Sequence, residues 1–312
     1  MELSVIIPTH NPHPGRLRRT LAGLRAQTLT TDHWETLLVD NASQPLVSLE
    51  AFHDDTPRNL RIVREPQLGL TAARRRGFTE ARAPLCVLVD DDNVLAPDYL
   101  AHVVRLFAEH PRLGALGGKS LPEFEVEPPG WAREFLPLLA LRDLGDQPCL
   151  AEGLRPPGAV RNRYPAEAAP IGAGMAIRRE AAAPWLAQSA GTALSDRRGA
   201  ELTSGGDNDI VFTVLQHGWA VGYFPELVLT HLIPAGRLTA DYLARLNHGI
   251  QKSWVQVLAK FEACPWPPIA GWTVPLRQLK ARFTHQAWTA SAAHIRWRGA
   301  CGMYEGLASV AS

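Results

Sequence analysis

Apolar and polar positions along residues 1–120 follow the alternation typical of strands and helices. Short continuous apolar runs predict strands that are buried on both faces, and apolar residues that recur every three or four positions predict helices. The predicted strands are 3–8, 34–40, 60–64, 85–90 and 113–118. The predicted helices are 15–26, 71–82 and 97–109. This alternation predicts an α/β fold in which helices cover both faces of a parallel sheet.

Polar side chains stand at the ends of three of these predicted strands. The three ends carry Pro8, Thr9, His10 and Asn11, then Asp40 and Asn41, then Asp90, Asp91 and Asp92. Ligands of parallel sheets bind beyond the carboxyl ends of the strands, so these side chains can converge on one site. Three adjacent carboxylates repel one another and are most easily held together by a cation, and their oxygen atoms suit Mg²⁺ or Mn²⁺. A solvated acidic turn before the next helix explains this stretch equally well.

Composition and charge narrow the class of protein. The chain has 312 residues, of which 46% are hydrophobic and 20% charged, which is typical of a globular α/β domain with an appendage. A net charge of +1 gives no argument for a nucleic-acid partner. The four cysteines form no CxxC pair, which favours a reducing compartment over a disulfide framework or a zinc site. We see neither a signal peptide nor an apolar run of the ~18 residues that span a bilayer. We therefore expect a cytoplasmic protein, with peripheral contact at the inner face of a membrane as an open alternative.

Several motifs, taken in their order, resemble those of the family 2 glycosyltransferases. They are Val5-Ile-Ile-Pro-Thr9, Leu37-Leu-Val-Asp40-Asn-Ala-Ser43, Gln67-Leu-Gly-Leu-Thr-Ala-Ala-Arg74-Arg-Arg-Gly77, Val87-Leu-Val-Asp90-Asp-Asp92, Ile171-Gly-Ala-Gly-Met-Ala-Ile-Arg178, Gly205-Gly-Asp207-Asn-Asp209-Ile210 and Tyr223-Phe-Pro-Glu226 followed by His231. The resemblance covers roughly residues 1–235. It implies a GT-A fold, in which a Rossmann-like, mostly parallel sheet is flanked by helices. It also implies an inverting enzyme that uses a nucleotide-activated sugar.

The resemblance implies a role for each matching residue on the donor side. The nucleotide-binding positions are Pro8, Thr9, Asp40, Arg74, Asp90 and Asp91. Among them, Asp40 is expected to bind the base, and Asp90 to contact the ribose or the water shell of a metal. Asp91, the middle residue of the DxD motif, is also acidic, and its simplest role is that of a hydrogen-bonded turn residue.

The metal and the catalytic base are implied in the same way. Asp92 and His231 match residues that hold Mn²⁺ or Mg²⁺, and Asp207 matches the catalytic base; the glutamate that usually precedes this base is Gly206 here. Both assignments have structural alternatives. Ser204 and Asp207 fit a capping box that opens a helix over 208–217, and a histidine beside apolar residues is often a core residue. Asp209 lies on another face of that helix and is interpreted as structural.

The segment after the first five predicted strands is expected to bind the acceptor. Residues 119–170 are rich in proline, glycine and aromatic residues without periodicity, which predicts an active-site loop or lid. Trp131 can stack on a sugar ring or anchor the loop, and Gly172 and Gly174 can let the backbone approach the substrate. These three residues are weak candidates for acceptor binding.

The C-terminal part has a helical character. Apolar residues at helical spacing from about Thr239 to Phe261 predict a long helix, and a second helical region follows in which tryptophans lie among Arg and Lys residues. These helices can pack on the catalytic domain, join two copies in a homodimer, or lie on an anionic membrane. The predicted organisation is a catalytic domain over 1–235, divided into a nucleotide-binding half 1–118 and an acceptor half 119–235, and a helical extension over 236–312.

Together these patterns indicate a metal-dependent inverting glycosyltransferase. It would move a sugar from a nucleoside-diphosphate donor, with a UDP-sugar favoured, to a hydroxyl of a saccharide or lipid-linked saccharide during surface or extracellular polysaccharide synthesis. A receiver-like or phosphatase-like Mg²⁺ domain needs an acidic residue at the end of the first strand, where Pro8 and Thr9 stand. An inactive nucleotide-sugar-binding or assembly subunit is the second alternative, and retention of Asp90, Asp92 and Asp207 argues against it.

Overall fold

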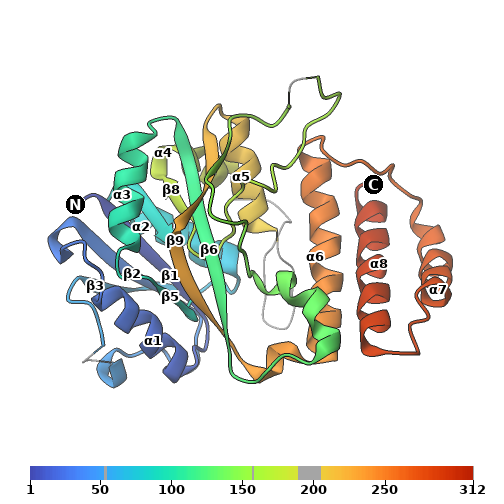
Figure 1. The fold of residues 1–312 in the computed structure, drawn as a ribbon, viewed down its shortest axis with the longest axis horizontal. Coiled ribbons are helices and arrows are strands. Elements are labelled where there is room, and N and C mark those ends of the chain that lie inside the picture. Colours follow the sequence, from blue (N-terminus) through green and yellow to red (C-terminus); the bar gives the residue numbers. More distant parts are fainter. Residues whose placement is uncertain (53–54, 157, 189–204, 312) are drawn as a thin grey trace.

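One large sheet forms the centre of the computed structural model, which describes residues 1–52, 55–156, 158–188 and 205–311 (Figure 1). The strand order is β3-β2-β1-β4-β8-β6-β9-β5, and β7 also pairs with β9. The strands are β1 (Leu3–Thr9), β2 (Trp34–Asn41), β3 (Leu60–Glu65), β4 (Leu85–Leu88), β5 (Asn93–Leu95), β6 (Leu113–Phe124), β7 (Cys149–Ala151), β8 (Ala176–Arg178) and β9 (Ala220–Ile233). The α-helices are α1 (Pro14–Arg25), α2 (Leu70–Glu80), α3 (Tyr99–Glu109), α4 (Arg179–Gln188), α5 (Gly206–Gln216), α6 (Ala240–Lys260), α7 (Val274–Thr284) and α8 (Ser291–Ser309).

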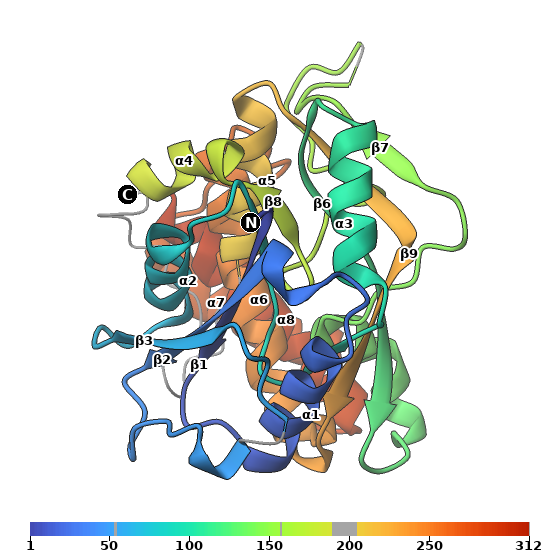
Figure 2. The same cartoon turned by 90° about the vertical axis from the view of Figure 1, so that its left-hand side faces the viewer.

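Helices cover both faces of the sheet because successive residues of a strand point to opposite faces. Along β1, Val5 and Ile7 belong to a core cluster with residues of α1 and α3, whereas Ile6 belongs to a cluster with residues of α2, α4 and α5. Figure 2 shows α1 and α2 on opposite sides of β1. Burial on both sides explains why β1 reads as a continuous apolar run, with all seven residues buried.

The sheet is parallel in its N-terminal half and mixed beyond it. Strand β1 pairs in parallel with β2 and β4, and β2 pairs in parallel with β3. Strand β8 is antiparallel to both β4 and β6, whereas β6 and β9 run parallel to each other. The short β5 is antiparallel to β9, and this pairing sets Asn93 opposite His231. Residues from distant parts of the sequence thereby meet at one edge of the sheet.

Three C-terminal helices form a layer beyond the sheet, at the right of Figure 1. Helix α8 approaches α6 closely because glycines face it: a Cβ at Gly302 would lie 2.0 Å from the carbonyl oxygen of His248. Glu305 of α8 joins the three helices, because it accepts hydrogen bonds from His248 Nε2 of α6 and Gln278 Nε2 of α7, each at 3.1 Å. Within the described residues, no helix combines the length and apolarity needed to cross a membrane.

The fold class expected from the sequence is confirmed, as an α/β sheet flanked by helices with a helical C-terminal region. The predicted long helix corresponds to α6, and every predicted strand of residues 1–120 is present. The helix predicted from Pro97 begins two residues later, at Tyr99. Residues 119–170 are less loop-like than expected, because they hold the end of β6, a 3-10 helix at Gly130–Leu139 and β7. The division of the chain at residue 235 stays a prediction.

Candidate active site

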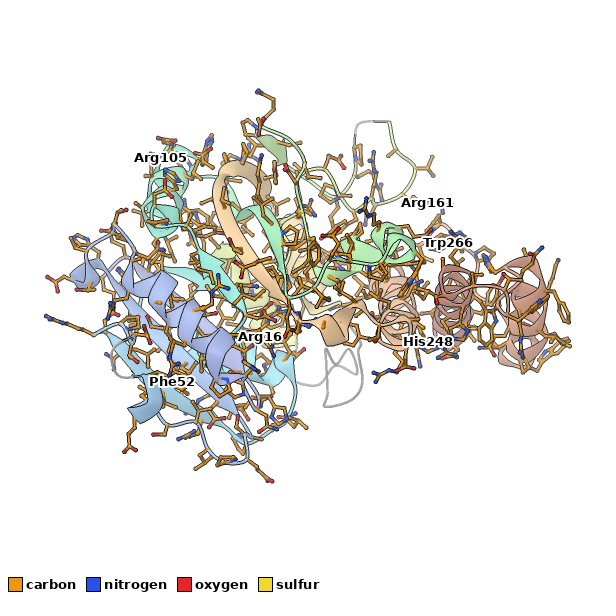
Figure 3. All side chains as sticks on the ribbon, turned by 60° about the horizontal axis from the view of Figure 1, so that its bottom comes forward. Arg16, Phe52, Arg105, Arg161, His248 and Trp266 are labelled. Atoms are coloured by element: carbon orange, nitrogen blue, oxygen red, sulfur yellow. The ribbon has the colours of Figure 1, made fainter. Side chains whose placement is uncertain are left out.

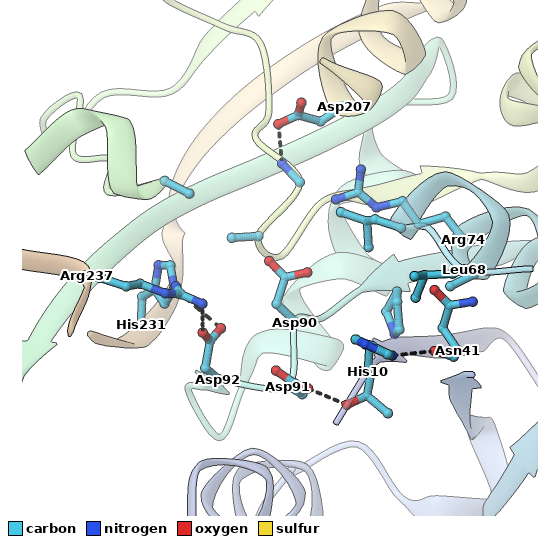
Figure 4. Close-up of a pocket in the computed structure, with 17 residues that line it drawn as sticks. His10, Asn41, Leu68, Arg74, Asp90, Asp91, Asp92, Asp207, His231 and Arg237 are labelled. Atoms are coloured by element: carbon cyan, nitrogen blue, oxygen red, sulfur yellow. Dashed lines mark hydrogen bonds and ion pairs between the residues drawn. The ribbon is translucent and has the colours of Figure 1, made fainter. Parts of the chain in front are cut away.

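A cavity of about 290 Å³ lies beyond the carboxyl ends of β1 and β4 (Figure 4). Ligand sites of such sheets form at this edge, where strands end and loops begin. Of the residues predicted from the sequence, those that line the cavity are Pro8, Thr9, Arg74, Asp90, Asp91, Asp92, Gly172, Asp207 and His231. His10, Asn41 and Arg237 line it as well. The structure therefore brings together side chains from both halves of the predicted catalytic domain.

The three aspartates form a turn between β4 and β5. Asn93, which is fully buried, closes this turn: its N–H donates to the Asp90 carbonyl oxygen at 3.0 Å, and its side-chain oxygen accepts from the Asp90 N–H at 3.3 Å. The Asp92 carbonyl oxygen accepts from the N–H of Leu232 at 2.9 Å. Main-chain hydrogen bonds therefore hold these aspartates at the edge of the cavity, and the stretch is not simply a solvated turn.

Asp91 makes a local contact within this turn. The Thr9 hydroxyl donates to its carboxylate. Burial, together with the neighbouring charges of Asp92 and Asp90, raises the pKa of Asp91 to about 7, although the bond from Thr9 works in the opposite direction. This contact matches the hydrogen-bonded turn residue described for Asp91 from the sequence, and its nucleotide-binding role stays a prediction.

Asp92 and His231 approach one another at the far side of the turn. Asp92 is 3% exposed, and its Oδ1 lies 3.4 Å from His231 Nε2. Arg237 contacts both: its Nη2 lies 2.8 Å from Asp92 Oδ2, and its Nη1 lies 3.1 Å from His231 Nε2. Burial lowers the pKa of Arg237, but Asp92 and the other nearby acidic groups outweigh burial and hold the pKa above its ordinary value. The guanidinium therefore supplies a permanent positive charge at this position.

Asp92 Oδ1 and His231 Nε2 are donor atoms that could hold a divalent ion once Arg237, which contacts both residues in this structure, has moved away from them. Ligands about 2.1 Å from an octahedral ion and at right angles are separated by about 3 Å, close to the 3.4 Å observed here. His231 Nδ1 is buried and has no hydrogen-bond partner in the described part of the chain. That part holds no group of three or more His, Cys, Asp or Glu residues arranged around one point. The protein offers two ligands, so a fit to Mn²⁺ or Mg²⁺ requires substrate phosphates to complete the coordination.

Asp207 lies at the start of α5, where Gly205 is the N-cap residue. Its Oδ1 accepts from the N–H of Asn208 and its Oδ2 from the N–H of Gly172, both at 3.0 Å. The carboxylate is thereby tied to the segment before β8 as well as to its own helix. Ser204, the other residue of the predicted capping box, lies outside the described residues, so the structure does not test this capping box.

Asp209, two residues further along α5, is part of the structural frame. Its Oδ2 accepts from the indole N–H of Trp185 at 3.0 Å, and its Oδ1 from the ammonium group of Lys260 at 2.5 Å. The side chain is 4% exposed and does not line the cavity. These contacts join α5 to α4 and α6, in agreement with the structural role inferred from the sequence.

Arg74 and Gly172 are in close contact on another wall of the cavity. A Cβ at Gly172 would lie 2.5 Å from Arg74 Nη2 and 3.4 Å from Asp207 Cβ. The guanidinium of Arg74 therefore occupies the space that a side chain at position 172 would take, and a larger residue there would displace it. Sequence reasoning singled out both residues, although it linked Gly172 to the substrate and not to Arg74.

Three further candidates do not line this cavity. Asp40 accepts hydrogen bonds from the N–H groups of Ser43 and Val47 and pairs with Arg64, so it fixes the loop after β2. Gly174, at φ +78°, accepts from the Tyr99 hydroxyl through its carbonyl oxygen at 2.6 Å. Trp131 packs partly buried against a cluster that includes residues of α6 and α8. Roles of these residues in nucleotide or acceptor binding stay predictions.

Arg237 was missed by sequence reasoning, whereas His10 and Asn41 were seen at strand ends but given no role. Arg237 sits in a 3-10 helix at Ala235–Leu238, six residues after His231. In the sequence, Arg237 is only a basic residue soon after the last motif. Its neighbours in the sequence do not distinguish it from the other arginines. His10 Nδ1 lies 2.8 Å from the Asn41 carbonyl oxygen, which joins the ends of β1 and β2.

Comparison with known proteins places these observations in context. The sequence model of glycosyl transferase family 2 matches residues 4–183. The chain is 33% identical over 103 residues to the succinoglycan biosynthesis protein ExoW of Rhizobium meliloti (strain 1021), over 32% of each chain. It is 32% identical over 112 residues to the uncharacterized protein y4gI of Sinorhizobium fredii, over 35% of this chain and 12% of that one. The chain thus spans about a third or less of the length of these curated relatives.

Among solved structures, the chain is similar to residues 1–349 of S. aureus TarS. Without ligand the TM-score is 0.49, and in complex with UDP it is 0.47. The sequence identity is 13% in both cases, over 99% of this chain and 90% of the TarS chain.

Proposed function

The chain belongs to glycosyl transferase family 2, and on this basis we propose that it transfers a sugar from a nucleoside-diphosphate donor to an acceptor hydroxyl in the cavity beyond β1 and β4. One observation carries the proposal: five residues from four separate motifs line the same cavity, and these are Arg74, Asp90, Asp92, Asp207 and His231. Residues that only stabilise the fold would have no reason to line one cavity together. The cavity is lined by both negatively and positively charged side chains, and chemistry on a diphosphate requires both.

Asp207 is proposed as the base that accepts the proton of the attacking hydroxyl. Two backbone N–H groups, of Asn208 and Gly172, fix the orientation of its carboxylate. A carboxylate oxygen that accepts one hydrogen bond keeps a second lone pair for the acceptor hydroxyl. General-base catalysis of this kind contributes typically ~10²–10⁴-fold. A single base that acts on a hydroxyl opposite the leaving group gives inversion at the anomeric carbon, as the family resemblance implies.

The opposite side of the cavity is proposed to hold the diphosphate. Asp92 and His231 would hold Mn²⁺ or Mg²⁺, and the ion would supply Lewis-acid stabilisation of the departing phosphate oxygens. Arg237 contacts Asp92 Oδ2 and His231 Nε2 in this structure, so its guanidinium would have to leave these atoms when the ion binds, and it would then contact the diphosphate. Arg74, on the wall shared with Gly172, presents a second guanidinium to the nucleotide. Metal dependence, and the choice between the two ions, belong to this proposal.

The biological setting is proposed from the relatives. ExoW is named a succinoglycan biosynthesis protein, and the shared third of each chain supports a role for this chain in extracellular polysaccharide synthesis. The acceptor would then be a saccharide or lipid-linked saccharide, met on the cytoplasmic side of the membrane. A UDP-sugar stays the favoured donor.

Calorimetric titration with UDP, GDP and dTDP, each with Mn²⁺ and with EDTA, tests the proposal. We expect one diphosphate to bind in a metal-dependent way and the corresponding nucleotide sugar to be turned over. Binding without turnover, tested across sugars and with acceptor extracts, would identify an inactive nucleotide-sugar-binding subunit. If the folded protein binds none of the three diphosphates, the proposed donor site is wrong.

A further inference from the structure

Helix α7, the 3-10 helix before it at Gly271–Thr273 and the turn after it expose a row of large apolar side chains. We call this set the α7 apolar face; it consists of Trp272, Leu276, Leu279, Phe283 and Trp288, whose exposed fractions are 78%, 64%, 52%, 62% and 56%. Phe283 and Trp288 are in edge-to-face contact, with ring centroids 5.4 Å apart. Single exposed apolar residues are ordinary on protein surfaces, but contiguous groups of them mark interaction sites.

This face points away from the protein. Ala281 is buried, and Gln278 is held by α8, since its carbonyl oxygen accepts from the Trp297 indole and its amide donates to Glu305. At 100° per residue, positions 278 and 281 share one side of a helix, and positions 276, 279 and 283 share the opposite side. Figures 1 and 3 show α7 as the outermost helix at one end of the molecule, with no described element beyond it. The α7 apolar face is therefore not needed to attach α7 to α8.

The segment that contains α7 is basic, although Arg296 within it is paired with Glu134 of another segment. Between Glu262 and Glu305 the chain contains no acidic residue, whereas it contains Arg277, Lys280, Arg282, Arg296 and Arg298. The whole chain has a net charge of only +1, so positive charge is concentrated at this end of the molecule. By helical spacing, Lys280 and Arg282 lie on the two sides of the α7 apolar face.

We propose that α7 docks on the surface of an anionic lipid bilayer, with the α7 apolar face inserted among the headgroups and upper acyl chains. Tryptophan and phenylalanine are favoured at that depth, and flanking Lys and Arg side chains can reach the lipid phosphates. A second copy of this chain is a worse occupant. In a two-fold dimer through this face, each positive segment would oppose its own equivalent, and the segment offers no carboxylate to compensate.

Co-sedimentation with lipid vesicles tests the proposal directly. Vesicles of phosphatidylcholine alone are compared with vesicles that contain about 30% phosphatidylglycerol, a composition that gives a negative surface potential. Each Lys or Arg near such a surface contributes about fivefold in binding, so the three cations of α7 predict roughly 100-fold stronger binding to the anionic vesicles. Raising the salt to about 0.5 M should remove most of this difference.

Matched variants locate the surface. Leu276→Glu with Phe283→Glu should lower binding to anionic vesicles at least about tenfold, because two apolar side chains leave the interface and two negative charges enter it. Leu144→Glu with Val160→Glu changes exposed apolar residues away from α7, 45% and 92% exposed, and should bind as the wild type does. Circular dichroism shows whether each variant is folded. Quenching of wild-type tryptophan fluorescence by brominated acyl chains tests insertion without any substitution.

Several results would overturn the proposal. These are no binding of the wild type to anionic vesicles, equal binding to neutral vesicles, or no quenching by brominated lipid. Equal binding by the Leu276→Glu, Phe283→Glu variant would also exclude α7 as the docking surface. A concentration-dependent dimer that this variant abolishes, without vesicle binding, would assign the face to a second copy. Nucleotide binding by the same proteins is measured in parallel. Vesicle binding and nucleotide binding can then fail separately, so the test of membrane docking does not depend on the proposed glycosyl transfer.

Discussion

Replacing Asp207 by asparagine separates proton transfer from donor binding. Both carboxylate oxygens accept from backbone N–H groups, those of Gly172 and Asn208 at 3.0 Å. An asparagine side chain must present its NH₂ group to one of these donors, so one hydrogen bond is lost and the N–H group is left unsatisfied. Such a loss costs about 1–3 kcal/mol. At the slope of about 2–4 °C for each kcal/mol that holds for domains of 150–250 residues, Tm should fall by roughly 2–12 °C.

The catalytic effect should exceed the effect on stability. Loss of the base should lower turnover by ~10²–10⁴-fold, whereas the affinity for the nucleoside diphosphate with Mn²⁺ should change by no more than about twofold. Turnover is measured as release of the nucleoside diphosphate from the nucleotide sugar that the titrations identify. It is measured well below the Tm of the variant, and binding is measured by calorimetry.

Asp209→Asn provides the matched control on the same helix. Asp209 holds Trp185 and Lys260 and lies outside the cavity, so this substitution should lower Tm while turnover per folded molecule stays near the wild-type value. Normal turnover by the Asp207→Asn variant would refute the assignment of the base. Equal losses of turnover in both variants would show that disturbance of α5, not the missing carboxylate, causes the effect.

Three further predictions concern the metal site and the helical extension. Asp92→Ala should weaken nucleotide binding in Mn²⁺ at least about tenfold relative to its effect in EDTA, because one of two protein ligands is lost, whereas the release of Arg237 from its ion pair acts under both conditions; equal losses under both conditions would contradict the metal assignment. Gly302→Ala should lower the free energy of unfolding by about 1–3 kcal/mol in denaturant titrations, since its Cβ would lie 2.0 Å from the His248 carbonyl oxygen, whereas Gly153→Ala has open space and serves as control. Burial raises the pKa of Glu305, but hydrogen bonds from α6 and α7 and positive charges on α6 outweigh burial and hold this pKa below its ordinary 4.5. Glu305 therefore stabilises the fold above pH 4.5, and this contribution disappears as the pH falls through the lower pKa of the folded state. Glu305→Gln should accordingly lower Tm at pH 7, and this loss should shrink as the pH falls below 4.5; a loss that does not change with pH would point to shape and not charge.

The parallel half of the sheet could be predicted because its strands carry their own signal. A strand buried on both faces must be apolar at every position, as β1 is, and such a run is visible without knowing its neighbours. Helix α6 is visible for a similar reason, since one apolar stripe packs on the rest of the protein. The sequence order of motifs then indicated which strand ends carry the site.

The mixed half could not be predicted because its strands depend on partners that are distant in sequence. Asn93–Leu95 is too short to have a period, and it is a strand because β9 pairs with it. Arg237 joins the cavity through the same pairing, since the 3-10 helix that carries it follows β9 directly. The sequence left both sugar stacking and loop anchoring open for Trp131, and it gave no sign that this residue packs against a cluster with residues of α6.

The pairing of β5 with β9 also has a consequence for the order of folding. The main-chain bond from Leu232 to Asp92, and the register that sets Asn93 opposite His231, fix the spacing of the carboxylate and the imidazole. The pairing of β5 with β9 closes a long loop of the chain, and this closure costs conformational entropy. The contacts of the completed sheet offset that cost, so non-local strand pairs of this kind form late. We therefore expect the side of the cavity that carries Asp92 and His231 to appear in the last stage of folding, after the β1–β4 half is already assembled. A nascent chain that ends before His231 would contain β1 to β4 but would lack the imidazole that lies beside Asp92.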